Sequence, residues 1–238
     1  MKLPRRLKIT EMRGNFMEKM FPDEMIAKIR KAPVMAVLVV DAVEDAVPLA
    51  KALLEGGVSA IELTLRTPAA LGALERIRAE VPDILAGIGT ILNVEQVRSV
   101  KERGAAFGVS PGLNSAVVKA ARGLNLPFAP GIMTPSEIEA AHELGCTVMK
   151  LFPSEPAGGL AYLKSINAPY AHLGIKYIPL GGVSIENLAS YLESPEILAV
   201  GGSWLAPRKL IQTKAWKEIS KNCAAATEIA IKAGRSNG

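Results

Sequence analysis

The sequence predicts an α/β fold, a (β/α)8 TIM barrel with an extra N-terminal helix. Eight short apolar segments recur along the chain, and their starts lie 20 to 28 residues apart. The stretches between them have helical apolar spacing and helix start signals. Strands that alternate with helices at this interval form a parallel sheet, and eight of them close a barrel. The predicted strands are residues 34–41, 59–67, 84–92, 106–112, 127–134, 147–154, 175–182 and 197–204.

An open, doubly wound sheet is the alternative architecture. It usually carries a Gly-rich G-x-G-x-x-G turn after its first strand, whereas Val40-Asp41-Ala42 follows the first segment here. The sequence contains no linker rich in Pro, Gly or Ser, so residues 17–235 are predicted to form one barrel domain. Within it, residues 17–32 are the extra helix, expected to cover the bottom of the barrel. Residues 1–16 form a basic N-terminal extension.

Capping residues predict where the helices begin and end. Thr67-Pro68 and Thr134-Pro135 each pair an N-cap with proline at the first helical position, and Glu137 completes a capping box with Thr134. Further predicted N-caps are Asn93, Asn114 and Ser184. The predicted stop signals are Gly56, Gly104 and Gly145.

The charge distribution argues against nucleic acid as the main partner. The net charge of +5 is the sum of +4 over residues 1–20, +5 over residues 207–238 and −4 over the 186 residues between. A fold that binds nucleic acid carries its positive charge on the fold itself. The longest apolar run is too short to span a bilayer, and Cys146 and Cys223 form neither a disulfide framework nor a metal motif. We therefore expect a cytoplasmic protein with two reduced thiols, no membrane partner and no bound metal.

Polar residues alternate along one predicted strand. In residues 61–67, period-two alternation places Glu62, Thr64 and Arg66 on one face and the aliphatic residues on the other. The aliphatic face should pack against the helices, so the polar face points to the barrel axis. Catalytic residues of such barrels come from the carboxyl ends of several strands. Arg66 also has the fork geometry that suits a substrate carboxylate.

Lys150 interrupts another apolar strand, and a lysine is rarely buried unless it is paired. One interpretation is a purely structural ion pair with Glu62. The other is a nucleophile, because burial and the guanidinium of Arg66 both disfavour the ammonium form and a neutral amine attacks a carbonyl. In that case Glu62 would move the protons of Schiff-base chemistry.

Glycines at three strand ends predict close contact with a ligand. Gly87-Ile88-Gly89-Thr90 places a hydroxyl at the mouth of the barrel. Gly181-Gly182 and Gly201-Gly202-Ser203 end the last two strands, where barrels often bind phosphate through backbone N–H groups. The two pairs together favour an anion site.

These motifs, together with Ser110-Pro111-Gly112, Pro130-Gly131 and Lys150-Leu151-Phe152-Pro153 with Glu155, resemble the 2-keto-3-deoxy-6-phosphogluconate / 4-hydroxy-2-oxoglutarate aldolases over about residues 24–207. That resemblance implies a trimeric, cofactor-independent class I aldolase that acts on a small 2-keto acid or its phosphate.

The resemblance also implies a role for each motif residue. Lys150 would form the imine and Glu62 would be the general acid/base, acting through a water. Arg66 and Thr90 would hold the pyruvyl carboxylate. Phe152 and Pro130 would pack around the substrate. The distal phosphate or carboxylate would lie against Gly181, Gly182, Gly202 and Ser203.

The sequence departs from the family pattern at one place. The family commonly has Pro-Thr-Gly-Gly where this chain has Pro179-Leu180-Gly181-Gly182. The resemblance implies that Leu180 replaces a hydroxyl near the pyruvyl carboxylate, so we expect an effect on substrate preference and rate. Two alternatives stay open at this point: a phosphosugar isomerase or synthase, for which Asp41 is the one candidate base, and a non-catalytic barrel that binds phosphate or a keto acid.

Overall fold

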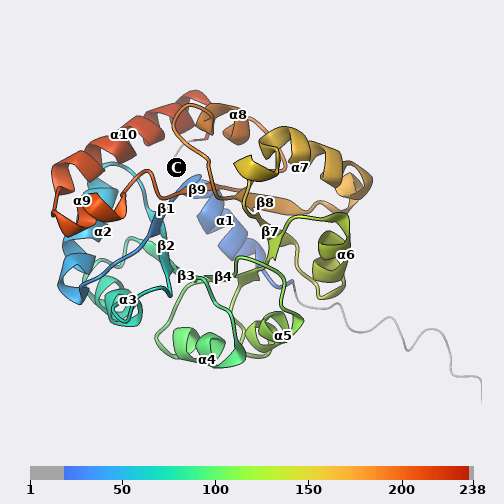
Figure 1. Ribbon diagram of the computed structural model, residues 1–238, viewed down its shortest axis with the longest axis horizontal. Coiled ribbons are helices and arrows are strands. Elements are labelled where there is room, and N and C mark those ends of the chain that lie inside the picture. Colours follow the sequence, from blue (N-terminus) through green and yellow to red (C-terminus); the bar gives the residue numbers. More distant parts are fainter. Residues whose placement is uncertain (1–18, 236–238) are drawn as a thin grey trace, which may run out of the picture.

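The computed structural model describes residues 19–235, so the predicted extension over residues 1–16 lies outside the described residues. Figure 1 looks along the axis of a ring of helices that surrounds parallel strands. The strands are β1 Val34–Leu38, β2 Ala60–Thr64, β3 Leu85–Gly89, β4 Gly108–Val109, β5 Phe128–Ala129, β6 Gly131–Ile132, β7 Val148–Leu151, β8 Lys176–Pro179 and β9 Val200–Gly202.

These strands form the predicted eight-membered barrel. One sheet has the order β5-β4-β3-β2-β1-β9, and the other has the order β6-β7-β8. Pro130 separates β5 from β6, because proline has no N–H to donate, and the two short strands occupy one barrel position. On the other side, a bridge between Tyr177 and Ile197 joins β8 to the segment that leads into β9. All pairs are parallel, and every segment predicted as a strand contains one or two observed strands.

Helices alternate with the strands as predicted, but the extra helix begins at Asp23, and residues 19–22, within its predicted range of 17–32, are not helical. They are α1 Asp23–Lys31, α2 Ala46–Glu55, α3 Ala70–Glu80, α4 Val94–Glu102, α5 Ser115–Gly123, α6 Pro135–Glu143, α7 Gly159–Asn167, α8 Leu188–Leu192, α9 Arg208–Gln212 and α10 Trp216–Lys232. Short 3-10 turns add η2 Val43–Asp45, η3 Glu155–Ala157 and η4 Ala168–Leu173.

Three of the predicted N-caps are confirmed and two are wrong. Asn93 and Asn114 accept hydrogen bonds from the first turns of α4 and α5, and Thr134 forms the capping box of α6. Thr67 does not cap α3, because its hydroxyl donates to the carbonyl of Val40 on the neighbouring strand end. Ser184 does not cap a helix either: α8 begins only at Leu188, and the Ser184 hydroxyl donates to Glu186.

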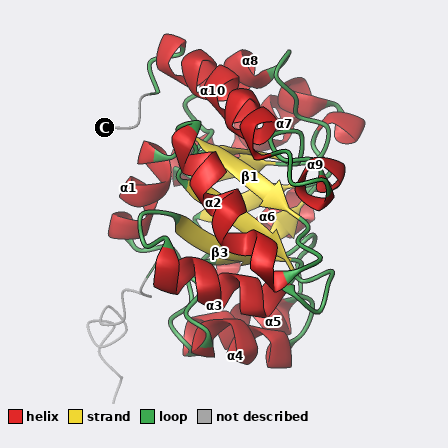
Figure 2. Ribbon diagram, turned by 90° about the vertical axis from the view of Figure 1, so that its left-hand side faces the viewer, coloured by secondary structure: helices red, strands yellow, loops and turns green. Residues whose placement is uncertain are grey.

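The extra helix α1 covers the end of the barrel opposite the active face. In Figure 2 it lies at one end, and the arrowhead of β1 points toward the other. Phe21 and Ile29 are fully buried and belong to one apolar cluster with Met35, Ala60 and Val148 at the starts of strands. A larger cluster fills the space between the strands and the surrounding helices and contains Ile61 and Leu63. The aliphatic face of β2 therefore packs outward, as its alternation predicts.

Both cysteines are free and buried. Burial raises the pKa of the Cys146 and Cys223 thiols to about 12, so both stay protonated at neutral pH. Within residues 19–235, none of the helices has the length and apolar character that crossing a membrane requires.

Candidate active site

Lys150 and Glu62 meet inside the barrel. Lys150 lies on β7 and Glu62 on β2, and both side chains point to the axis. The Lys150 Nζ is 3.1 Å from Glu62 Oε1 and 3.4 Å from Oε2. Lys150 is 5% exposed and Glu62 is 1% exposed. The structure thus brings together two residues that are 88 positions apart in the chain, as the alternation along β2 predicts.

A glycine on β3 makes room for the Glu62 carboxylate. Gly89 pairs with Thr64 in the β2–β3 register. A Cβ atom at Gly89 would lie 1.9 Å from Glu62 Oε1, which is far inside van der Waals contact. The glycine of the G-x-G-T motif is therefore required by the acid on the neighbouring strand, and not by the turn alone.

Thr90 follows β3 with a positive backbone angle, φ +62°. This left-handed conformation is unfavourable for a β-branched residue and costs on the order of 1–3 kcal/mol. Such strain is concentrated at functional sites, where the surrounding fold enforces it. Thr90 is half-buried at the carboxyl end of the strand next to Glu62, the position that the sequence predicts for a substrate hydrogen bond.

Pro130 and Phe152 surround Lys150. The Pro130 carbonyl accepts a hydrogen bond from the Lys150 backbone N–H at 2.9 Å, so the break between β5 and β6 lies directly beside the lysine. The Lys150 Nζ is 5.2 Å from the centre of the Phe152 ring, within cation–π range. The aromatic face excludes water from one side of the amine.

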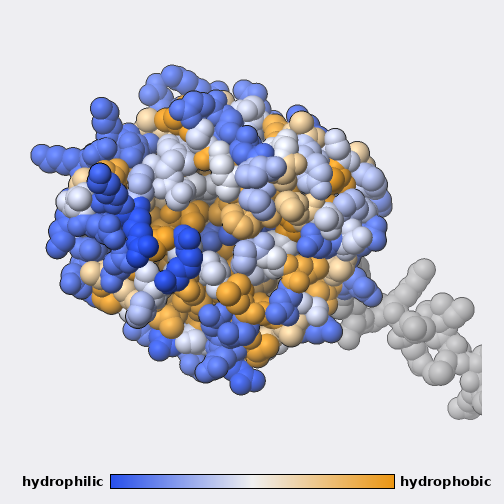
Figure 3. Space-filling model, in the orientation of Figure 1, coloured by the Kyte–Doolittle hydropathy of each residue, from blue (hydrophilic) through white to orange (hydrophobic). Residues whose placement is uncertain are grey.

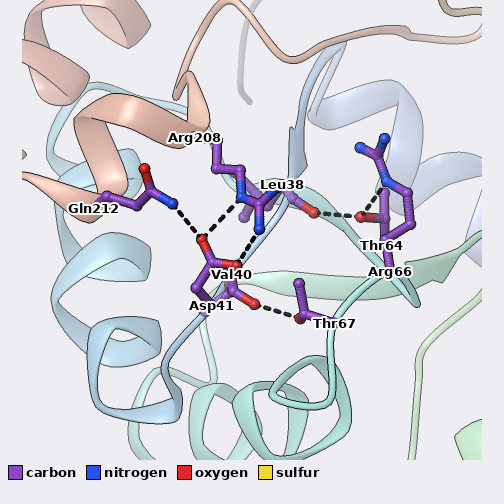
Figure 4. A network of polar contacts seen from close by, with 8 residues as sticks. All are labelled: Leu38, Val40, Asp41, Thr64, Arg66, Thr67, Arg208 and Gln212. Carbon is purple, nitrogen blue, oxygen red and sulfur yellow. Dashed lines mark hydrogen bonds and ion pairs between the residues drawn. The ribbon is translucent and has the colours of Figure 1, made fainter.

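Arg66 lies at the rim of the barrel, and a hydrogen bond from its Nε to Thr64 Oγ1, 3.2 Å long, orients its guanidinium group. The Thr64 hydroxyl in turn donates to the carbonyl of Leu38 on β1, as Figure 4 shows. Arg66 is exposed, whereas Thr64 and Glu62 are buried, so the predicted polar face runs from the interior of the barrel to its mouth.

A cavity of about 450 Å³ opens beside Arg66. It is lined by Val37, Val39, Arg66, Ser203, Trp204, Ala206, Pro207 and Arg208. In Figure 3 the same face shows an apolar hollow bordered by strongly hydrophilic groups on the side of α9. The cavity combines an apolar floor with the Arg66 guanidinium group at its rim, which suits a small organic anion.

Arg208 at the start of α9 pairs with Asp41 after β1. Two bonds join them, Nε to Oδ2 at 2.9 Å and Nη2 to Oδ1 at 2.5 Å, and Gln212 donates to Oδ2 at 2.8 Å (Figure 4). These donors, with Arg208 first, lower the pKa of Asp41 to about 2. Sequence reasoning missed this network, since the three residues come from opposite ends of the chain and no motif connects them.

The glycines of the last two strands lie where the sequence places them. Gly181 and Gly182 follow β8 with φ angles of +89° and +87°, and Gly202 ends β9. A Cβ atom at Gly202 would lie 2.2 Å from the Trp204 Nε1, so the indole packs directly over the Gly202 backbone. Ser203 is exposed and lines the cavity next to Arg66.

Leu180 occupies the position at which the sequence departs from the family pattern. It is 4% exposed and belongs to an apolar cluster that includes Ile178 and Phe152. A Cβ atom at Gly201 would lie 2.7 Å from the Leu180 Cγ. The leucine therefore fills apolar space between β8 and β9.

The described residues hold no group of three or more His, Cys, Asp or Glu side chains that could bind a metal ion. The polar groups that meet at the barrel axis are the amine of Lys150 and the carboxylate of Glu62. A buried amine beside a carboxylate can form an imine with a ketone while the carboxylate moves protons.

Comparison with known proteins places the chain in a family. The family model "KDPG and KHG aldolase" matches residues 25–222. The chain belongs to this aldolase family. A 2-dehydro-3-deoxy-phosphogluconate aldolase of Haemophilus influenzae is 42% identical over 198 residues, which cover 83% of this chain and 92% of that protein. A KHG/KDPG aldolase of Escherichia coli K12 is 41% identical over 196 residues, or 82% and 91% of the two chains.

Solved structures of the family have the same fold. A KDPG aldolase from Legionella pneumophila, with pyruvate captured as a covalent carbinolamine, superposes with a TM-score of 0.80 at 37% identity and covers 84% of this chain and 97% of its own. The KDPG aldolase of Zymomonas mobilis ZM4 with 3-phosphoglycerate gives a TM-score of 0.77 at 37% identity, with 84% and 94% covered. The barrel predicted from the sequence is thereby confirmed as the aldolase fold.

Proposed function

We propose that the protein is a pyruvate-dependent class I aldolase, a carbon–carbon lyase that cleaves 2-keto-3-deoxy-6-phosphogluconate, 4-hydroxy-2-oxoglutarate or both to pyruvate and an aldehyde. The observation that carries this proposal is the buried Lys150 Nζ, 3.1 Å from a buried carboxylate. A structural ion pair needs no substrate-binding groups nearby, whereas Glu62 shares the polar face of its strand with Arg66. Arg66 in turn lines a cavity.

The chemistry follows from the pair. Glu62 accepts a proton from the Lys150 ammonium group, and the neutral amine attacks the C2 carbonyl of the substrate to form a carbinolamine. Loss of water gives an iminium ion. This cation withdraws the electrons of the C3–C4 bond as a base removes the C4 hydroxyl proton, so the aldehyde leaves and an enamine remains. Protonation at C3 and hydrolysis of the iminium release pyruvate and restore Lys150. Glu62, acting through a water, donates and accepts the protons in these steps.

The surrounding residues bind the two ends of the substrate. Arg66 and Thr90 hold the pyruvyl carboxylate, since a guanidinium fork and a hydroxyl suit its two oxygens. Phe152 and Pro130 pack against the carbon chain. The distal phosphate or carboxylate lies at the end of β8 and β9, where glycines allow backbone N–H groups to approach an anion: Gly181, Gly182, Gly202 and Ser203.

Asp41 argues against an isomerase that uses no imine. It is the one candidate base for that reaction, but Arg208 and Gln212 donate hydrogen bonds to its carboxylate and lower its pKa to about 2. A carboxylate with so low a pKa is a weak base near neutral pH. This observation favours the lysine mechanism.

We further infer the setting of the enzyme from its family. The functional unit is a homotrimer of chains in which residues 17–235 form one barrel domain and residues 1–16 are an added basic segment. The ligand is a small 2-keto acid or its phosphate, nucleic acid and membranes are not partners, and the protein acts in the cytoplasm.

Pyruvate release tests the proposed function. Each of the two substrates is supplied to the full chain, and pyruvate is measured by coupling to lactate dehydrogenase. Lys150→Met should abolish release from both. Lys176→Met is the matched control, because Lys176 is also a strand lysine but bonds to the carbonyl of Pro195. Pyruvate release that survives Lys150→Met would refute the imine mechanism, and ligand binding without any release by the wild type would indicate a non-catalytic barrel.

A further inference from the structure

The loop after β8 packs against the segment after β7. The Ser154 N–H donates to the Leu180 carbonyl at 2.7 Å, and the Glu155 N–H donates to the Gly181 carbonyl at 2.9 Å. A Cβ atom at Gly182 would lie 2.6 Å from the Glu155 Cβ and 3.0 Å from its Cγ. Glu155 therefore lies directly against the glycine loop to which the proposed function assigns the distal anion.

A carboxylate beside an anion site requires an explanation, because like charges repel strongly at short range. Here the carboxylate is held elsewhere. The Tyr191 hydroxyl, from α8, donates to Glu155 Oε1, and Ser154 Oγ lies 2.8 Å from the same hydroxyl. Tyr191 is 1% exposed and Ser154 is fully buried, whereas Glu155 is exposed. The buried hydroxyls of Tyr191 and Ser154 thus fix the exposed side chain of Glu155.

The held carboxylate points to the start of α7. Glu155 Oε1 lies 2.7 Å from the position of a Cβ atom at Gly159, the first residue of that helix. The partial positive charge of a helix N-terminus favours an anion there. The part of Glu155 nearest Gly182 is its aliphatic stem. Burial and Glu155 raise the pKa of Tyr191 to about 12, so the hydroxyl keeps its proton throughout the neutral range.

We propose that Tyr191 and Ser154 are positioning residues that hold the Glu155 carboxylate away from the glycine loop, and that this makes the loop selective for a dianionic substrate end such as phosphate. The inference rests on the proposed function, since it concerns the distal end of the same substrate. Neither residue needs to touch the substrate. They act by fixing the position of the Glu155 carboxylate.

Substrates that differ only in the phosphate test this role. In the condensation direction, pyruvate is combined with glyceraldehyde 3-phosphate or with unphosphorylated glyceraldehyde. Tyr191→Phe frees the carboxylate, and we expect KM for the phosphorylated aldehyde to rise about tenfold. KM for the neutral aldehyde should change by less than about twofold. The kcat with either aldehyde and borohydride trapping of pyruvate should stay at the wild-type level.

Variants of the exposed Glu155 separate charge from packing without disturbing a buried site. Glu155→Asp keeps the charge, but its shorter stem cannot reach the Tyr191 hydroxyl, so it should reproduce the KM increase. Glu155→Gln keeps the length and removes the charge, and combined with Tyr191→Phe it should restore the wild-type KM. Tyr177→Phe is the matched control, because it also removes a buried tyrosine hydroxyl, one that donates to Asn167. It should leave the ratio of the two KM values unchanged.

Three results would overturn the inference. The first is an equal KM increase for both aldehydes, and the second is an unchanged KM for the phosphorylated aldehyde in both Tyr191→Phe and Glu155→Asp. The third is a failure of Glu155→Gln to restore that KM in the Tyr191→Phe background. If the wild type neither traps pyruvate nor condenses either aldehyde, the proposed function fails by itself. Calorimetric binding of inorganic phosphate then decides the inference. Weaker binding to Tyr191→Phe than to the wild type supports it, and equal binding refutes it.

Discussion

Replacing the two buried charges one at a time and together measures their interaction. Glu62→Gln and Lys150→Met keep the size of each side chain and remove its charge. At a separation of 3.1 Å, an effective dielectric constant of about 20 gives an attraction of about 5 kcal/mol. Each single substitution leaves the opposite charge buried without its partner, which typically costs about 3–5 kcal/mol of the free energy of unfolding.

The double variant buries no charge, so its free energy of unfolding should be far closer to that of the wild type than the sum of the two single losses. Chemical denaturation of the four proteins at neutral pH gives the coupling energy, which we expect to be about 3 kcal/mol or more. Losses that add to within about 0.5 kcal/mol would show that the two side chains do not interact, and would refute the geometry on which the mechanism depends.

Three further predictions concern residues around the Lys150–Glu62 pair and at the mouth of the barrel. Gly89→Ala should abolish pyruvate release and lower the free energy of unfolding by about 1–3 kcal/mol, because its Cβ would collide with Glu62 Oε1; an active Gly89→Ala enzyme would contradict this. Thr90→Gly relieves the left-handed backbone, so urea denaturation should show a gain of about 1 kcal/mol while KM for pyruvate rises; a stability loss would contradict the assignment of strain. Asp41 has its pKa lowered from 3.8 to about 2, so it stabilises the fold above pH 4 and loses this effect as the pH falls to 2. The Asp41→Asn variant should therefore be less stable than the wild type near neutral pH, and acid unfolding curves of the two proteins should converge near pH 2. Equal stability at pH 7 would refute the role of the Arg208 pair.

The barrel could be predicted because local signals repeat along the chain. The caps at Asn93, Asn114 and Thr134 are recognised from side chains that satisfy the first turn of their own helix. The cap expected at Thr67 failed for a tertiary reason, since its hydroxyl finds the carbonyl of Val40 on another strand end. Local patterns do not show which of two acceptors or donors a polar side chain will use.

Local patterns also predict the Glu62–Lys150 pair, but they do not predict the contacts between loops around it. Alternation along β2 directs Glu62 inward, and a lone lysine in the apolar strand β7 must find a partner inside the same barrel. By contrast, the Tyr191–Glu155 contact depends on how the loop after β7 folds against α8. The Asp41–Arg208 pair joins segments 167 residues apart. Sequence periodicity carries no information about such loop-to-loop contacts.

Covalent trapping tests whether Lys150 forms an imine with pyruvate. The full chain is incubated with pyruvate and borohydride, digested, and mapped by mass spectrometry, with Lys150→Met treated in parallel. We expect one reduced pyruvyl group on Lys150 in the wild type and in Lys176→Met, and none on Lys150→Met. An adduct on another lysine, or pyruvate release from an enzyme that forms no adduct at Lys150, would refute the imine mechanism at Lys150.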